Sequence, residues 1–553
     1  MEIQKAAQLA IENVLKEGLT DIFDRPFEVN LLKNMEFRKK VENEIIRSLK
    51  GNSFESLGVN DINHVLLPKN SPFNFRRCAL IHPMDTLKYL ALVLTIANDI
   101  EKARVPIKSK KVFSYRLMQN KGYLFNKQYN ITTFKSKTRD RANMKKTKYI
   151  VSCDIANYYD RLNLHRLENT LLSINCDKDK VKLLNQLLLF WSGRDSYGLP
   201  VGSNASRIIA EANLIGVDNY LNSMNVDFIR FVDDYRIFAP DAHTAHYWLT
   251  ILIERLWQDG LTINMSKTKI ESYSNDTKNK DEGKNIFVHE QKNNKEGNPF
   301  LIRAGYGGTV PTQFRKISVK ERNRLEKNDI INYFNEIKRK DILEVSEFVE
   351  FIKTIISKSK YKYFESVLEL LEEYLQLTPY VVDTLIKHSE YIGNDLRIKI
   401  KEYFTNKLTV ENYIPEYLET AYIRLLGNVY YSDKKLLMKC FREIKLNTGA
   451  YIGRAILDSL EKIVNREDVI EIRKCFNRAN LWEKRQIIKI IINVLDKDEK
   501  EAWLRNIKYI ESSELFLQEV AHPSKKKECK KVFKKIIQYN KTSLCHLISL
   551  LVA

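Results

Sequence analysis

The spacing of apolar residues divides the chain into two parts. Up to residue 313, short apolar runs typical of buried strands alternate with amphipathic helical segments. From residue 314 onward, amphipathic helical patterns recur at intervals of roughly 15–25 residues, and Gly and Pro become scarce. We therefore predict an α+β domain over residues 1–313, followed by an all-α helical-repeat domain over residues 314–553, for which "HEAT-like" describes the architecture only.

Within the first part, two runs rich in β-branched and aromatic residues, "FIRFV" and "YRIFA", flank the adjacent residues Asp233 and Asp234. This pattern predicts a β-hairpin with both carboxylates at its tip. Upstream, "KKTKYIVSCDI" predicts a loop followed by a buried strand that ends at Asp154. Because adjacent like charges repel, the aspartate pair needs a neutralising partner.

Helical and strand segments around the hairpin predict its topology. Two helices are expected over residues 163–191, and a third after Gly202 with Ser203 as its N-cap. Asp241 begins the helix "AHYWLTILIERLWQD", which Gly260 can end, and "LTINMSKTKI" predicts a further strand. The order strand, helices, hairpin, helix, strand favours a split βαβ sheet.

Several other segments are interpreted as surface structure. The N-terminus, "MEIQKAAQLAIENVLKEG", predicts an amphipathic helix, not a signal peptide, and "LLPKNSPFNFRR" predicts a Pro/Asn-rich loop. The Lys/Arg-rich residues 135–149 form a predicted loop that either follows a phosphate backbone or is simply solvated. Residues 274–300 and 304–311 are interpreted as breaks in the regular structure.

Composition limits the class of protein. The chain has 553 residues, 44% of them apolar, and a formal net charge of +21, which favours a polyanionic partner such as nucleic acid over the alternative of a merely lysine-rich chain. Its seven cysteines form no CxxC pair, so no zinc site or disulfide framework is indicated. No run of 18 apolar residues occurs, and we expect no membrane association and a cytoplasmic location.

The predicted chemistry depends on three carboxylates. In a split βαβ sheet the strand ending at Asp154 can lie beside the hairpin that carries Asp233 and Asp234. Mg²⁺ favours carboxylates, waters and substrate phosphates, and a pair of such ions suits phosphoryl transfer. A solvated turn is the alternative interpretation for any single Asp-Asp pair, and the apolar flanks and the upstream strand weaken it.

These residues fall within motifs that resemble those of reverse transcriptases. "DIANYYDRL" resembles motif A, residues 198–218 ("GLPVGSNASRIIAEANLIGVD") resemble motif B, and "FVDD" stands where the family usually has YxDD. "GLTINMSKTKI" resembles motif D, and "RRCALIHPMDTLKYLALVLTIANDIEKARVP" resembles the fingers motifs of bacterial members. The motifs occur in order, and Phe231 for the usual Tyr is the departure. With the long helical C-terminal region, the chain looks most like the abortive-infection (Abi) or defense-associated type.

The resemblance implies a fold of fingers and palm and assigns roles to single residues. Asp154 and Asp233 would hold two Mg²⁺ ions (Mn²⁺ being the alternative), Asp234 would be a weaker ligand, and Lys267 would assist the leaving pyrophosphate. Tyr159 would be the steric gate that excludes a 2′-hydroxyl; a core aromatic is the alternative. The remaining residues implied to bind the nucleotide are Arg76 or Arg77 at the triphosphate and Gly198, Pro200, Gly202 and Ser206 in the motif B turn.

The activity implied is that of a metal-dependent DNA polymerase acting in antiphage defense. It would add dNTPs to a 3′-hydroxyl or to a protein tyrosine primer, with or without a template, and its partners would be dNTPs, a DNA product that can be covalently attached, and a second copy of the chain. No primer tyrosine is identified, and residues 1–88 contain no tyrosine. The alternatives are templated reverse transcription of a partner non-coding RNA and a non-catalytic nucleic-acid-binding scaffold.

Overall fold

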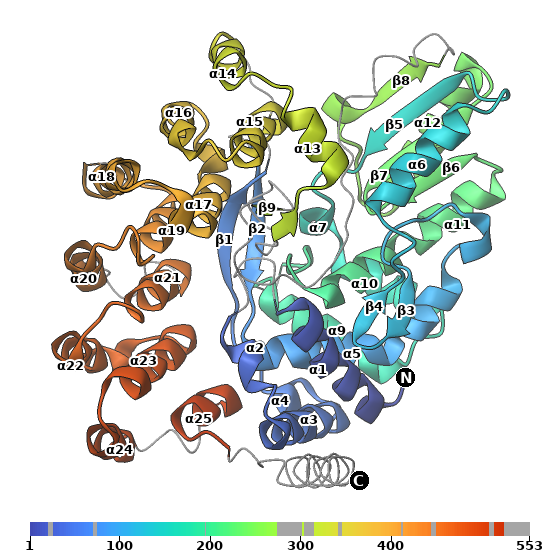
Figure 1. Ribbon diagram of the computed structural model, residues 1–553. Coiled ribbons are helices and arrows are strands. Elements are labelled where there is room, and N and C mark those ends of the chain that lie inside the picture. The colour runs from blue at the N-terminus through green and yellow to red at the C-terminus, as the bar shows by residue number, and fades with distance from the viewer. Residues whose placement is uncertain are drawn as a thin grey trace, which may run out of the picture.

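The computed structural model describes most of the chain, and the fold is discussed only for those residues. They are residues 1–19, 26–69, 74–193, 195–273, 301–303, 314–340, 345–410, 413–443, 450–507 and 514–524. In Figure 1 an α+β part lies at the right, and the C-terminal helices form an arc at the left that returns to the N-terminal helices. The predicted breaks at 274–300 and 304–311 lie outside the described residues. None of the described helices is both long and apolar enough to cross a bilayer.

One antiparallel sheet organises the α+β part. Its four strands, in the order β6-β7-β5-β8, are β5 (Tyr149–Asp154), β6 (Phe228–Phe231), β7 (Asp234–Ala239) and β8 (Lys269–Ser272). This is the predicted split βαβ order. The last strand begins later than predicted, because residues Met265–Lys267 form a 3₁₀ turn and the ladder starts only at Lys269.

Both faces of this sheet are covered, as the alternation of its side chains requires. Tyr235 and Ile237 join the main core on the side of α10 (Asn204–Asn213), α11 (Ile215–Ser223) and α12 (Ala242–Gln258). Phe238 faces the other way, toward Phe134 of α6 (Ile131–Ala142). The loop predicted over residues 135–149 is therefore wrong in its first half, which is helical.

The N-terminal half is mostly helical, and its predicted caps are confirmed. Ser203 accepts the N–H of Ser206, Asp241 accepts that of Thr244, and Gly260 follows α12 with φ +73°. The remaining elements here are α1 (Ile3–Glu17), α2 (Glu28–Leu31), α3 (Met35–Lys50), α4 (Phe54–Leu57), α5 (Pro83–Ala103), β3 (Leu117–Asn120), β4 (Tyr123–Phe125), α7 (Tyr158–Arg161), α8 (Leu164–Ser173) and α9 (Lys178–Trp191).

The segment "LLPKNSPFNFRR", predicted as a loop, contributes to a β-hairpin. Strands β1 (Asn63–Pro68) and β2 (Phe75–Leu80) pair antiparallel, with Pro68 opposite Phe75. Cys78 and Leu80 of β2 belong to the hydrophobic core of the C-terminal helices, whereas Ala79 belongs to the main core. The hairpin thus joins the two parts of the molecule, as Figure 1 shows.

The C-terminal part consists of successive helices after a short hairpin, β9 (Leu301–Arg303) with β10 (Phe314–Lys316). This strand pairing crosses the boundary predicted between residues 313 and 314. The helices are α13 (Val319–Leu325), α14 (Ile330–Lys338), α15 (Val345–Ser357), α16 (Phe364–Leu371), α17 (Thr378–Lys387), α18 (Asn394–Val410), α19 (Glu416–Leu426), α20 (Lys434–Glu443), α21 (Ala450–Leu460), α22 (Arg466–Lys474), α23 (Leu481–Val494), α24 (Lys497–Arg505) and α25 (Leu515–Ala521).

A buried ion cluster closes the far end of the arc against the N-terminal helices. Glu28 of α2 is fully buried and accepts hydrogen bonds from Arg454 at 2.9 Å and Arg485 at 3.0 Å. Burial raises the pKa of Glu28, but the two arginine charges outweigh it and lower that pKa overall. His82 stacks on Trp482 beside the cluster. The C-terminal arc is therefore held at the β1–β2 hairpin and at Glu28.

Removing the charge of Glu28 tests this closure. We expect Glu28→Gln to lower the free energy of unfolding by about 3–5 kcal/mol, because two buried guanidinium groups lose their shared carboxylate. Denaturant unfolding followed by tryptophan fluorescence measures it, since Trp482 lies against Arg485. Glu499→Gln, in the exposed pair with Arg466, is the matched control and should leave stability nearly unchanged. An equal change in the free energy of unfolding in the two variants would contradict the role of Glu28 in closing the arc.

Candidate functional site

The tip of the β6–β7 hairpin has an unusual backbone. Phe231 pairs with Asp234, so Val232 and Asp233 form the turn. The predicted hairpin is present, but its turn lies one residue earlier than predicted, because Asp234 is the first residue of β7. Val232 has φ +58°, in the left-handed region that β-branched residues rarely adopt. Its carbonyl accepts a hydrogen bond from the Arg230 guanidinium at 2.7 Å, which helps to hold the turn.

Strand pairing brings the three predicted carboxylates to one end of the sheet. Asp154, the last residue of β5, lies opposite Asp234, the first residue of β7. The N–H of Ile155 donates to the carbonyl of Asp233 at 3.0 Å, so the turn is also attached to the exit of β5. All three aspartates line one cavity of about 420 Å³, a size that suits a nucleotide-sized ligand.

Protein cations already neutralise part of this charge. The Lys267 ammonium lies 2.9 Å from an Asp154 oxygen, and Arg236 forms an ion pair with Asp234. Burial, and then the charge of Asp154, raises the pKa of Asp233 to about 6. Burial also raises the pKa of Asp234, although the neighbouring Arg236 opposes the effect.

The carboxylates fit a hard divalent cation by their chemistry. Oxygen donors in a cavity that also holds basic groups are what Mg²⁺ with a phosphate ligand requires. Within the described ranges, however, no three His, Cys, Asp or Glu side chains converge as a ready-made metal site. The ion pairs give a physical reason, because Lys267 and Arg236 direct Asp154 and Asp234 toward themselves.

Basic residues of the β1–β2 hairpin line the same cavity. Arg76 and Arg77 both contribute, so the structure brings both predicted candidates to the site, and Lys69 joins them. Burial and then the charge of Arg76 lower the pKa of Lys69. Arg77 lies 3.3 Å from the ring of His64. Together these cations form a positive wall suited to a phosphate chain.

Tyr159 also lines the cavity, from the short helix α7 that follows β5. Burial raises its pKa well above the ordinary value, and Tyr115 contributes to the shift, so the phenol stays neutral. The carbonyl of Tyr159 accepts the N–H of Leu199 at 2.9 Å. The segment resembling motif A is thereby joined to the turn that precedes α10.

Of the predicted motif B residues, Gly202 lines the cavity, with φ +124°. Gly198, Pro200 and Ser206 do not belong to the cavity lining. Ser206 is fully buried and donates to the Pro200 carbonyl at 2.6 Å, and Gly198 adopts φ +98°. These three residues shape the turn that leads into α10.

Several residues of the cavity were not identified from the sequence. Asp160, which follows Tyr159, is one of them. Arg207 could have been found, because it follows Ser206 in motif B. Lys69 lies directly after β1, in a segment predicted only as a loop. No signal in the sequence indicated Tyr115. By contrast, Arg141 and Lys146 of the basic segment 135–149 both pair with Asp227. Besides Asp160, the residues that were missed are Lys69, Asn74, Tyr115, Asn157, Arg207 and Asn264.

Comparisons with known proteins match part of the chain to one family. Residues 96–298 match the family described as "Reverse transcriptase (RNA-dependent DNA polymerase)". No curated protein matches the chain. Solved structures with similarity include telomerase from Candida albicans with a fragment of telomeric RNA, at 13% identity, 70% coverage of this chain, 64% of that chain and a TM-score of 0.29. An apo telomerase from Candida tropicalis, truncated from its C-terminal domain, shows 11% identity and a TM-score of 0.29. The match covers 47% of this chain and 55% of that chain.

The chain thus spans less than two thirds of these two telomerases. With identities below 25% and TM-scores below 0.5, these similarities establish no shared function. The family match covers the segments that carry Asp154, Tyr159, Gly202, Asp233 and Lys267. Residues 96–298 are therefore similar to reverse transcriptases, and this segment contains the three aspartates of the cavity.

Proposed function

We propose that this protein is a metal-dependent polymerase that adds deoxynucleotides to a primer end. The observation that carries the proposal is the shared cavity, in which Asp154, Asp233 and Asp234 lie at one end of a sheet together with arginine and tyrosine side chains. The three aspartates fall within the segment that matches the reverse transcriptase family. A dead scaffold would have no need for this complete set. Tyr159 favours DNA over RNA as the product.

Asp154 and Asp233 would hold two Mg²⁺ ions, with Mn²⁺ as the alternative. When bound, such ions activate the attacking hydroxyl and stabilise the leaving group. Asp234 would be the weaker ligand, because Arg236 already pairs with it and would have to yield. The three aspartates would thus differ in role although they share one cavity.

The chain's own cations would handle the triphosphate. Arg76 and Arg77 present guanidinium groups on the cavity wall and can bind phosphate oxygens in a forked geometry. Lys267 would move from Asp154 to the leaving pyrophosphate, since the two sites need a positive charge at different stages. Gly202 would allow the chain to approach the nucleotide closely, with Gly198, Pro200 and Ser206 shaping that turn.

The finer assignment is an abortive-infection or defense-associated polymerase. It is supported by the residue sequences of the motifs and by the long helical region after residue 314. A HEAT-like architecture for this region is part of the same proposal. Self-association, a cytoplasmic location and a tyrosine primer belong to the same proposal. Templated reverse transcription of a partner RNA is the second candidate. The net charge of +21 favours a bound nucleic acid but does not distinguish a template from a product.

Incubating the purified full chain with Mg²⁺ and each labelled dNTP, with and without RNA, tests the proposal. Product that forms without RNA and becomes mobile in a gel only after protease treatment would support untemplated, protein-primed synthesis. Product that requires RNA would support the templated alternative. Absence of incorporation with either Mg²⁺ or Mn²⁺ would overturn the polymerase assignment.

Neutralising Asp233 should abolish incorporation. We expect Asp233→Asn to reduce the rate at least roughly 100-fold, because an amide is a poor ligand for a divalent cation. The rate is measured by single-nucleotide addition, and circular dichroism checks the fold. Asp179→Asn, on the exposed first turn of α9, is the control and should behave as wild type. Near-normal incorporation by Asp233→Asn would contradict the metal assignment.

Shortening Tyr159 should admit ribonucleotides. The side chain lines the cavity, so Tyr159→Ala opens space beside the sugar, and the preference for dNTPs over NTPs should fall by about tenfold or more. The ratio of the two kcat/KM values measures the preference. Tyr159→Phe keeps the ring and should keep the preference. If the Ala variant excludes NTPs as strongly as wild type, Tyr159 is not the gate.

Lys267 should compete with a metal ion for Asp154. We expect Lys267→Met, which keeps the chain length but removes the charge, to tighten Mn²⁺ binding about three- to tenfold. Electron paramagnetic resonance of free Mn²⁺ measures the affinity without any need for catalysis. Lys269→Met removes a neighbouring exposed charge and is the control. Unchanged or weaker binding in Lys267→Met would contradict the competition.

A further inference from the structure

Three residues of the cavity wall have a strained backbone. Tyr115, Asn157 and Val232 are non-glycine residues with φ of +42°, +46° and +58°, and all three line it. Such conformations are costly for bulky side chains and persist only where the surroundings impose them. Asn157 and Val232 belong to the motifs discussed above, whereas Tyr115 comes from the segment before β3 and has no role so far.

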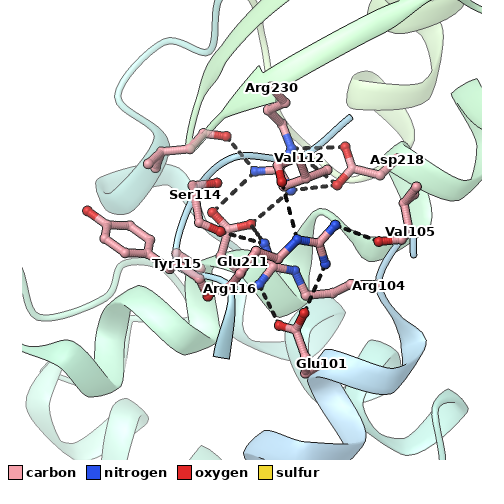
Figure 2. A network of polar contacts seen from close by, with 12 residues as sticks. Glu101, Arg104, Val105, Val112, Ser114, Tyr115, Arg116, Glu211, Asp218 and Arg230 are labelled. Atoms are coloured by element: carbon pink, nitrogen blue, oxygen red, sulfur yellow. Dashed lines mark hydrogen bonds and ion pairs between the residues drawn. The ribbon is translucent and has the colours of Figure 1, made fainter. Parts of the chain in front are cut away.

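Buried hydrogen bonds hold Tyr115 in this conformation. The Arg104 guanidinium donates to the carbonyl of Tyr115 at 2.9 Å and to that of Ser114 at 2.7 Å. Arg116, the next residue, donates through its side chain to the carbonyl of Val112 at 3.2 Å. In Figure 2 these groups gather on one side of the segment, and the Tyr115 ring projects away from them.

The buried polar cluster around Arg104 also holds the turn between β6 and β7, which contains Val232 and Asp233. Glu211 of α10 is buried and accepts from Arg104 at 2.6 Å and from Arg230 at 2.9 Å (Figure 2). Arg230 in turn donates to the carbonyl of Val232 and pairs with Asp218. One carboxylate therefore connects the arginines that hold two strained residues of the cavity wall, Tyr115 and Val232.

The ring of Tyr115 is fixed on several sides. Its centroid lies 6.3 Å from that of Phe231, beside the aspartate pair, and 5.1 Å from that of Phe125. The Arg207 guanidinium lies over the ring at 5.5 Å. Tyr159 lines the same cavity and is close enough to interact electrostatically with Tyr115. A residue that served only the core would not need an aromatic ring displayed in the cavity.

We propose that Tyr115 is a specificity-determining residue whose ring, with Tyr159, forms the wall against the 2′ position of the incoming sugar. This inference rests on the proposed polymerase function and deepens it. The buried Glu211 cluster sets the position of the ring, and the strain at residue 115 is the cost of displaying it there. Removing the ring widens the wall at a point that Tyr159 alone does not cover.

The test compares three variants of the full chain at residue 115. Tyr115→Ala removes the ring, Tyr115→Gly removes it and also relieves the positive φ, and Tyr115→Phe keeps it. The readout is the ratio of kcat/KM for a dNTP to that for the matching NTP. We expect the ratio to fall about tenfold or more in the Ala and Gly variants and to stay near wild type in the Phe variant.

Tyr413→Ala is the matched control, because Tyr413 also has a positive φ, of +66°, but is fully exposed. It should leave the ratio unchanged. Because glycine tolerates φ +42°, the Gly variant keeps the test decisive if the Ala variant folds poorly. A wild-type ratio in Tyr115→Gly, with incorporation intact, would overturn this inference alone. Absence of incorporation by the wild-type protein would overturn the proposed function, and this inference with it.

Discussion

The repulsion among three carboxylates at one end of a sheet is the constraint on which the site depends. Asp154, Asp233 and Asp234 are brought together by strand pairing that cannot be loosened without disrupting the sheet. Lys267 and Arg236 compensate Asp154 and Asp234, yet burial and the neighbouring charges still raise the pKa values of Asp233 and Asp234. The divalent ion proposed for this site would supply the positive charge that the protein's own cations do not fully provide.

Holding this geometry requires rigid support beneath it. The turn at Val232 and the segment at Tyr115 both have left-handed backbone, and both are bonded to arginines that meet on Glu211. Inside a protein an ion cluster of this kind is valuable mainly when every group is paired, because an unpaired buried charge is costly. We therefore infer that the cluster serves mainly to orient the backbone of the cavity wall at Tyr115 and Val232, and less to stabilise the fold.

The C-terminal helices matter to the site through the β1–β2 hairpin. Arg76 and Arg77 lie on a strand whose following residues alternate between two cores, with Ala79 in one and Cys78 and Leu80 in the other. The position of the positive wall relative to the aspartates thus depends on both cores. The clamp at Glu28 holds the far end of the same arc. A helical region joined in this way can influence the cavity without contributing a side chain to its lining.

A structural feature could be predicted from the sequence when it depends on residues that are close together along the chain. The sheet order, the helix caps and the aspartate pair were predictable, because strand alternation, capping side chains and turns leave local patterns. Helix α6 was missed because Phe134 and Ala142 are its buried positions, too few for an apolar stripe. The strands β1 and β2 were obscured by the turn residues between them.

Tyr115 lay beyond local reasoning for a different reason. Its conformation depends on Arg104, which bonds Glu211 107 positions further along the chain, and no local pattern reports such a contact. The candidate site residues found from the sequence were those whose residue type and immediate neighbours indicate a function, such as two adjacent aspartates. A residue whose role comes from where distant side chains hold it becomes visible only in the folded chain. The proposed specificity of this site therefore depends on the tertiary structure, whereas the proposed reactive groups can be found from the sequence.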